Sequence, residues 1–204
     1  MNRYRNSGSA TLLLILLTTF ISFPFLKNPV SDNVISGIPA YPDDPLPGHS
    51  GGFGEPNCQA CHFDMPLNDP AGTVEIKGIP EKYESGKAYQ LEIHIEHPEM
   101  NRAGFQFTAR FPDGEDKPGL QAGDIEADSS DSMVTMHEDI LYVHHTESGT
   151  IINSPHTKLW EITWSAPEIP SGPVVFNVAA NAANGDDSEF GDFIYLQEGI
   201  SNPD

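Results

Sequence analysis

The sequence predicts an all-β fold, an antiparallel immunoglobulin-like β-sandwich behind an irregular N-terminal arm. The main observation is strict alternation: Tyr89, Leu91, Ile93 and Ile95 are separated by single polar residues, as in a strand with one buried face. Similar or shorter apolar patterns predict seven further strands, at 73–76, 103–111, 133–137, 140–144, 160–164, 174–180 and 193–196. Turn-forming segments separate these runs, and no segment keeps helical periodicity over three turns. Short strands of this kind pack as two antiparallel sheets.

The chain of 204 residues divides into three predicted parts. Residues 1–36 form a signal peptide or an uncleaved N-terminal anchor, because Arg3 and Arg5 precede an apolar run at 12–25. Residues 37–71 form a linker rich in Pro, Gly, Ser and Asp that contains a cysteine motif, and residues 72–204 form the sandwich. We therefore expect an exported protein that is periplasmic, extracellular or on the cell surface.

The motif is Cys58-Gln59-Ala60-Cys61-His62, a C-x-x-C-H sequence of the kind that attaches c-type haem. Two thiols add to the haem vinyl groups, and the adjacent histidine binds the iron as proximal ligand. We predict one covalent haem held by Cys58, Cys61 and His62. The alternatives are a local disulfide, a thioredoxin-like redox site, which needs a βαβ context, and a zinc site, which commonly needs a second cysteine pair. No further cysteine exists in the chain.

Five segments of the second half occur in the order found in a known family. They are Gly104-Phe105-Gln106, then 142–146 (YVHHT), 160–167 (WEITWSAP), 179–185 (AANAANG) and 191–195 (GDFIY). Through them, residues 72–196 resemble bacterial reeler-like domains, relatives of the N-terminal module of reelin. The resemblance implies an immunoglobulin-like sandwich outside the cytoplasm, and several similar bacterial members carry a C-x-x-C-H segment just before it. It implies no particular activity.

The sixth ligand of the iron does not follow from the spacing of the motif. Met65 is too close to His62 in the chain to reach the opposite face of a haem. His145 is the first choice, because it lies in the His-Thr step of the reeler-like pattern. The remaining candidates, in order, are His144 and His97, then Met100 and Met136. The alternative for the 144–145 pair is a solvated surface position at the end of a strand.

The chain is strongly acidic, with a formal net charge of −20 and, from residue 28 onward, seven basic residues against 30 acidic ones. Such a surface repels nucleic acid and anionic lipid, so we expect no nucleic-acid partner, and membrane contact only through an uncleaved N-terminal segment. A redox partner protein would need a basic docking patch. The cluster Asp186, Asp187, Glu189 and Asp192 offers oxygen ligands for calcium, but its spacing is not that of an EF-hand loop and favours a solvated turn.

No nucleophile elbow, phosphate-binding loop or His-Glu-x-x-His motif is present, so the sequence does not predict an enzyme. The leading hypothesis is single-electron transfer by an exported monohaem protein. The first alternative is an extracytoplasmic binding, adhesion, or redox- or gas-sensing module with a structural or sensory haem. A haem enzyme such as a peroxidase is the weaker alternative. Two axial ligands favour electron transfer, whereas an open sixth position favours a sensor or enzyme.

Overall fold

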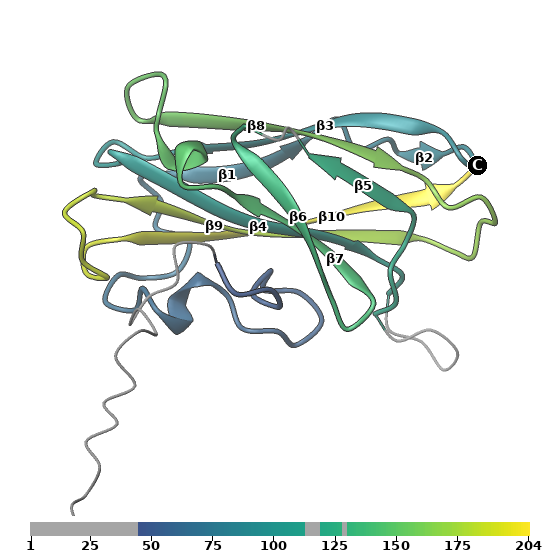
Figure 1. Cartoon of the computed structure of the whole chain (residues 1–204), viewed down its shortest axis with the longest axis horizontal. Coiled ribbons are helices and arrows are strands. Elements are labelled where there is room, and N and C mark those ends of the chain that lie inside the picture. Colours follow the sequence, from purple (N-terminus) through teal and green to yellow (C-terminus); the bar gives the residue numbers. More distant parts are fainter. Residues whose placement is uncertain (1–44, 113–118, 128–129) are drawn as a thin grey trace, which may run out of the picture. The chain divides into compact units, whose positions relative to one another are not determined.

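The computed structural model describes residues 45–112, 119–127 and 130–204, and the predicted signal or anchor at 1–36 lies outside them. Within the described residues the chain forms two β-sheets and two short 3-10 helices (Figure 1). The strands are β1 (Thr73–Lys77), β2 (Lys82–Tyr83), β3 (Ala88–Glu96), β4 (Arg102–Arg110), β5 (Asp124–Ala127), β6 (Ser132–His137), β7 (Ile140–His145), β8 (Thr157–Ser165), β9 (Val174–Ala183) and β10 (Phe193–Pro203). The helices are η1 (Cys58–Ala60) and η2 (Ser148–Thr150). The predicted all-β sandwich is confirmed.

The two sheets have the strand orders β1-β3-β8-β5 and β2-β10-β9-β4-β7-β6. Their strands pair antiparallel, except for the short parallel contact between β10 and β2. In the centre of the larger sheet, β4 pairs with β9 along its whole length and places Gly104 opposite Asn181. β7 pairs with the other edge of β4 only at Gln106 and Phe107. This register determines which side chains meet on the larger sheet.

One hydrophobic core fills the space between the sheets. The alternating residues of β4 that point inward, Phe105, Phe107 and Ala109, are buried there with Trp160 and Trp164 of β8. Phe105 contacts Trp160 with ring centroids 4.5 Å apart. Large aromatic side chains supply much of the apolar area that such a core removes from water. The core therefore stabilises the sandwich without any disulfide.

The outer face of the larger sheet is also covered. The segment 45–72, called the arm below, runs beneath β9 and β4 in Figure 1. The backbone N–H of His49 donates to Gln106 Oε1 (2.6 Å), and the N–H of Asn68 donates to the carbonyl of Ile194 (2.9 Å). As a result, Gln106 and Asn177 are buried although they lie on the polar face of their strands. Residues 37–44 of the predicted linker lie outside the described residues, and from residue 45 onward the linker packs against the sheet.

The sequence patterns missed two strands and shortened a third. β2 is two residues long and β5 only four, so neither gives a run of alternating residues long enough to predict a strand. The last strand was predicted to end at 196, whereas β10 continues to Pro203. Its second half carries few apolar residues and is held by backbone pairing with β9, from Gln197 opposite Val178 to Ser201 opposite Val174. No helix in the described part of the chain is long and apolar enough to span a membrane.

A largely buried ion pair fixes the arm just ahead of the cysteine motif. The guanidinium of Arg110, on the outer face of β4, donates to Glu55 Oε1 and to the hydroxyl of Tyr142. Tyr142 in turn donates to Glu55 (2.5 Å), and Ser50 Oγ donates to the second carboxylate oxygen (2.7 Å). Burial alone would raise the pKa of Glu55, but the hydrogen bonds from Tyr142, Ser50 and Arg110 hold that pKa below its ordinary value of 4.5.

Replacing Glu55 by Gln should lower the free energy of unfolding by about 1.5–3 kcal/mol at pH 7, the range for hydrogen bonds to charged groups. Because the pKa of Glu55 is lower in the folded chain, its stabilisation is complete above the ordinary value and is lost as pH falls through the folded value. Urea unfolding at pH 7 and at low pH measures both effects. Glu84→Gln, which removes an exposed pair with Lys87, is the control and should change little. Equal stability of the two variants at pH 7 would contradict the assignment.

Candidate functional site

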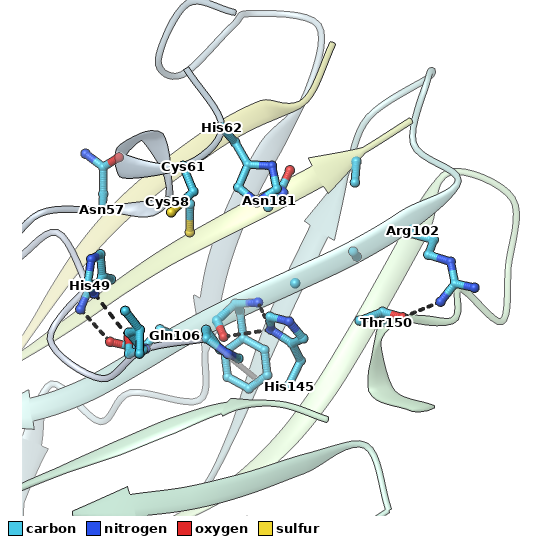
Figure 2. A pocket seen from close by; sticks show the side chains of 16 residues that line it. His49, Asn57, Cys58, Cys61, His62, Arg102, Gln106, His145, Thr150 and Asn181 are labelled. Atoms are coloured by element: carbon cyan, nitrogen blue, oxygen red, sulfur yellow. Dashed lines mark hydrogen bonds between the residues drawn. The ribbon is translucent and has the colours of Figure 1, made fainter. Parts of the chain in front are cut away.

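A partly open cleft with a cavity volume of about 280 Å³ lies between the arm and the outer face of the larger sheet. Cys58, Cys61 and His62 line it from the arm, and His145 lines it from the end of β7 (Figure 2). Apolar atoms of Leu46, Ala103 and other residues form much of the wall. The cleft therefore brings together all four site residues predicted from the sequence, although His62 and His145 are 83 positions apart in the chain.

The cysteine motif forms a single tight turn. Asn57 caps η1 by accepting a hydrogen bond from the N–H of Gln59 (2.7 Å). The N–H groups of Cys61 and His62 both donate to the carbonyl of Cys58, at 3.2 and 3.0 Å. One turn of this kind places both cysteines and His62 beside the same cavity. Burial raises the pKa of the Cys58 thiol to about 12, so this group stays protonated at neutral pH and is a weak partner for disulfide exchange.

His62 is oriented by a buried carboxylate. Its Nδ1 lies 2.7 Å from Asp192 Oδ2, and the Asp192 residue is 1 % exposed. Asp192 also accepts hydrogen bonds from the backbone N–H of Asn184 (3.1 Å) and from the side-chain amide of Asn181 (3.4 Å). A carboxylate held in this way keeps the proton on Nδ1 of the imidazole, so Nε2 carries the lone pair that binds a metal.

His145 is fixed by the backbone of β4. Its Nδ1 lies 2.9 Å from the amide nitrogen and 3.1 Å from the carbonyl oxygen of Phe105. The imidazole packs directly over Gly104: a Cβ atom at that position would lie only 2.7 Å from Cε1 of the ring. Gly104 is therefore required for space, and the ring is held beside the cleft. The tautomer that donates Nδ1–H to the Phe105 carbonyl leaves the lone pair on Nε2 for a metal, whereas the tautomer that accepts the Phe105 N–H at Nδ1 carries its proton on Nε2.

The strand register brings the supports of the two histidines together. Asp192, which holds His62, contacts Asn181 of β9, and His145 covers Gly104 of β4. Asn181 and Gly104 are direct partners in the β4–β9 ladder. Cα atoms of such partners lie about 4.5–5.5 Å apart. The two supports are thus one strand spacing apart, and both histidines line the same cavity.

The other candidates for the sixth ligand lie away from the cavity. Both ring nitrogens of His144 are within hydrogen-bond distance of other groups, Thr135 Oγ1 (2.9 Å) and the carbonyl of His145 (3.0 Å). His97 stacks on Phe193 with ring centroids 3.9 Å apart. Met100 is fully buried in the core, whereas Met136 is 67 % exposed on β6. Of the predicted distal candidates among the described residues, His145 alone lines the cleft.

Sequence reasoning missed three contributors to the cleft: His49, Arg102 and the role of Asp192. His49 lines the cavity, with Nδ1 3.1 Å from the carbonyl of Leu46. In Figure 2 Arg102 lies on the right, away from His49 on the left, and its Nη1 donates to Thr150 Oγ1 (2.8 Å). Because only seven basic residues follow residue 27, few positions can supply a positive charge, and Arg102 supplies one at this cleft.

The acidic segment that was weighed as a calcium site does not converge on one point. Asp192 is buried beneath His62, and Asp186 Oδ1 accepts the backbone N–H of Ser188 (3.0 Å) in the turn. Within the described ranges no three His, Cys, Asp or Glu side chains form a group that could hold a metal ion. A haem needs no such group, because the macrocycle supplies four of the six iron ligands.

Neither a family model nor a curated protein sequence matches this chain. It is similar to the human F-spondin reeler domain (fragment 1), with 17 % identity, TM-score 0.45, and coverage of 66 % of this chain and 89 % of that chain. The Reelin-N domain of F-spondin is 16 % identical with a TM-score of 0.47, and the match covers 72 % of this chain and 95 % of that chain. A cohesin module of a Clostridium perfringens family 33 glycoside hydrolase is 13 % identical with a TM-score of 0.43, and the match covers 66 % of this chain and 97 % of that chain. Reeler domains are thus among the similar structures. At these scores the similarities carry no argument about function, and the fold rests on its own strand order and register.

Proposed function

We propose that this chain is an exported monohaem c-type protein that transfers single electrons, with the haem held in the cleft between the arm and the larger sheet. The observation that carries the proposal is the convergence of Cys58, Cys61, His62 and His145 on one cavity. Two thiols, a proximal histidine and a second histidine are the donor set that a six-coordinate c-type haem requires. A bound haem would supply a reversible one-electron couple between ferric and ferrous iron.

The residues of the cleft fit such a group in further respects. The cleft exposes mostly apolar atoms, those of Leu46 among them, and such a wall suits a porphyrin face. Arg102 offers a cation for a propionate carboxylate, since Thr150 holds its guanidinium at the rim. The cleft is open on one side, so a macrocycle held there would keep an edge near solvent. An exposed edge suits exchange of electrons with a partner.

The two histidines would act in different ways. His62 donates its Nδ1 proton to the buried carboxylate of Asp192, which raises the basicity of the ring. His145 has the neutral peptide groups of Phe105 as the matching partner. If both rings held the iron, no position would remain for a substrate, which favours electron transfer over the enzyme and sensor alternatives. A pair of histidines also gives a lower potential than a Met/His pair.

The first test is covalent attachment. Protein produced with a c-type maturation system should keep its haem through acid–acetone extraction, because two thioether bonds survive denaturation. The double variant Cys58→Ser, Cys61→Ser should release any haem it has bound. His62→Ala is the control, because it removes the proximal nitrogen and leaves both thiols. Extractable haem in the wild-type protein would refute the proposal.

The second test concerns the distal ligand. His145→Ala should convert a low-spin visible spectrum into a high-spin one and allow carbon monoxide to bind the ferrous iron. Gly104→Ala should shift the spectrum in the same direction, because its Cβ would displace the His145 ring. His49→Ala and His144→Ala are the matched controls and should stay low-spin. A high-spin wild type, or loss of the low-spin form only in His49→Ala, would exclude His145 as the ligand.

The third test concerns Asp192. Asp192→Asn should raise the midpoint potential, because a less basic His62 stabilises ferric iron less. A 10–100-fold loss in ligand strength for one oxidation state corresponds to about 60–120 mV at about 59 mV per tenfold change. Glu198→Gln removes an equal charge from β10, the strand that directly follows Asp192, where the carboxylate accepts from Asn177 rather than from His62. Equal shifts of the midpoint potential in the two variants would mean that the loss of a charge, and not the contact with His62, causes the shift.

A further inference from the structure

Two phenylalanine rings are exposed beside the cleft and contact each other. Phe63 is 57 % exposed and Phe190 is 47 % exposed, and their rings meet edge to face with centroids 5.4 Å apart. Among the described residues no other phenylalanine is as exposed as these two, and those of the core are buried. Neither ring lines the cavity. An aromatic pair held at the surface is typical of a contact site for another molecule.

The exposure of Phe190 is built into the connection between β9 and β10. Its N–H donates to Ser188 Oγ (3.1 Å), and its carbonyl accepts from the side-chain amide of Asn184 (3.1 Å). The next N–H, that of Gly191, donates to both carboxylate oxygens of Asp64 at 2.9 and 3.0 Å. The connection is thus tied both to itself and to the arm. It holds the Phe190 ring outward against Phe63.

This aromatic pair lies next to the proximal ligand along both segments. Phe63 follows His62 directly in the arm. Phe190 comes two residues before Asp192, the carboxylate that binds the imidazole of His62. A molecule that covered the two rings would therefore lie within a few bonds of the ligand that the proposed haem uses. Short covalent and hydrogen-bonded connections to the iron favour electron exchange at this point of the surface.

The surroundings of the aromatic pair are acidic. Asp64 adjoins Phe63 and is exposed, and Asp186, Asp187 and Glu189 precede Phe190. With the excess of acidic residues over the whole chain, a second copy would bring one acidic rim against another, and like charges at an interface oppose association. Anionic lipid is repelled for the same reason. A partner with a basic rim around an apolar centre matches the charge and the chemistry of this surface.

We propose that Phe63 and Phe190, with the acidic rim of Asp64, Asp187 and Glu189, form the docking surface for a basic redox protein. The inference rests on the proposed function. In the complex one electron passes between the iron of this chain and the cofactor of the partner, and no bond is formed or broken. Apolar contact of the rings holds the complex, and the acidic rim speeds and orients the encounter.

The experiment uses the haem-loaded protein in its ferrous form and two ferric oxidants in rapid mixing. One is a basic cytochrome c, and the other is the small anion hexacyanoferrate(III), which needs no docking surface. Phe63→Ser with Phe190→Ser should slow oxidation by the cytochrome about tenfold, as expected when aromatic anchors are lost. Oxidation by hexacyanoferrate(III) should change less than twofold. Ile169→Ser with Ile200→Ser, which alters two exposed apolar residues elsewhere, is the control and should match wild type.

A second pair of variants tests the rim and does not depend on the aromatic variant folding. Asp187→Asn with Glu189→Gln should slow the cytochrome reaction several-fold at low ionic strength, and the difference should vanish in about 1 M salt, where the Debye length is about 3 Å. Glu126→Gln with Glu161→Gln removes two charges from the opposite sheet as the control. Equal rates for all variants would overturn the docking surface. So would sedimentation showing a wild-type dimer that the aromatic variant lacks. A chain without haem would instead refute the proposed function.

Discussion

Two carboxylate contacts anchor the cysteine turn of the arm to the sandwich, and the geometry of the cleft depends on them. Before the turn, the largely buried carboxylate of Glu55 in the arm binds Arg110 of β4. After the turn, His62 in the arm binds the buried carboxylate of Asp192, which directly precedes β10. Removing the partner of such a carboxylate costs several kcal/mol, so each contact strongly favours the observed position of the arm. The cysteine turn lies between these two contacts in the sequence and is thereby placed over the outer face of the sheet.

Apolar alternation predicted the strands that line the core, and it failed where other forces dominate. β3 and β4 follow it closely because each has one face in the core. The same rule suggests that the polar face of β4 is solvated. In the structure Gln106 and Thr108 on that face are buried, because the arm and neighbouring strand ends supply their hydrogen bonds. The residue pattern of β4 itself cannot show that an irregular segment of the chain covers its outer face.

The site was predictable to the extent that its chemistry is local. Cys58, Cys61 and His62 fall within five consecutive residues, so the motif can be recognised without any knowledge of the fold. The contribution of Asp192 depends on how β9 and β10 pair, and that of Arg102 depends on the end of β4. Neither register follows from composition. A glycine within a strand often marks a close approach by another group, and Gly104, under His145, is a local signal of this kind at the cleft.

The unequal partners of the two cleft histidines connect the structure with the choice between functions. His62 is backed by a buried charge, and that charge is itself held by two asparagines. His145 is backed by the peptide group of Phe105 and by the close packing over Gly104. Because an imidazole next to a carboxylate is the stronger electron donor, an iron shared by the two rings would be bound more tightly on the His62 side. The electron-transfer and sensor hypotheses therefore differ in one bond, that of His145 to the iron. Its strength depends on how firmly β4 holds the ring.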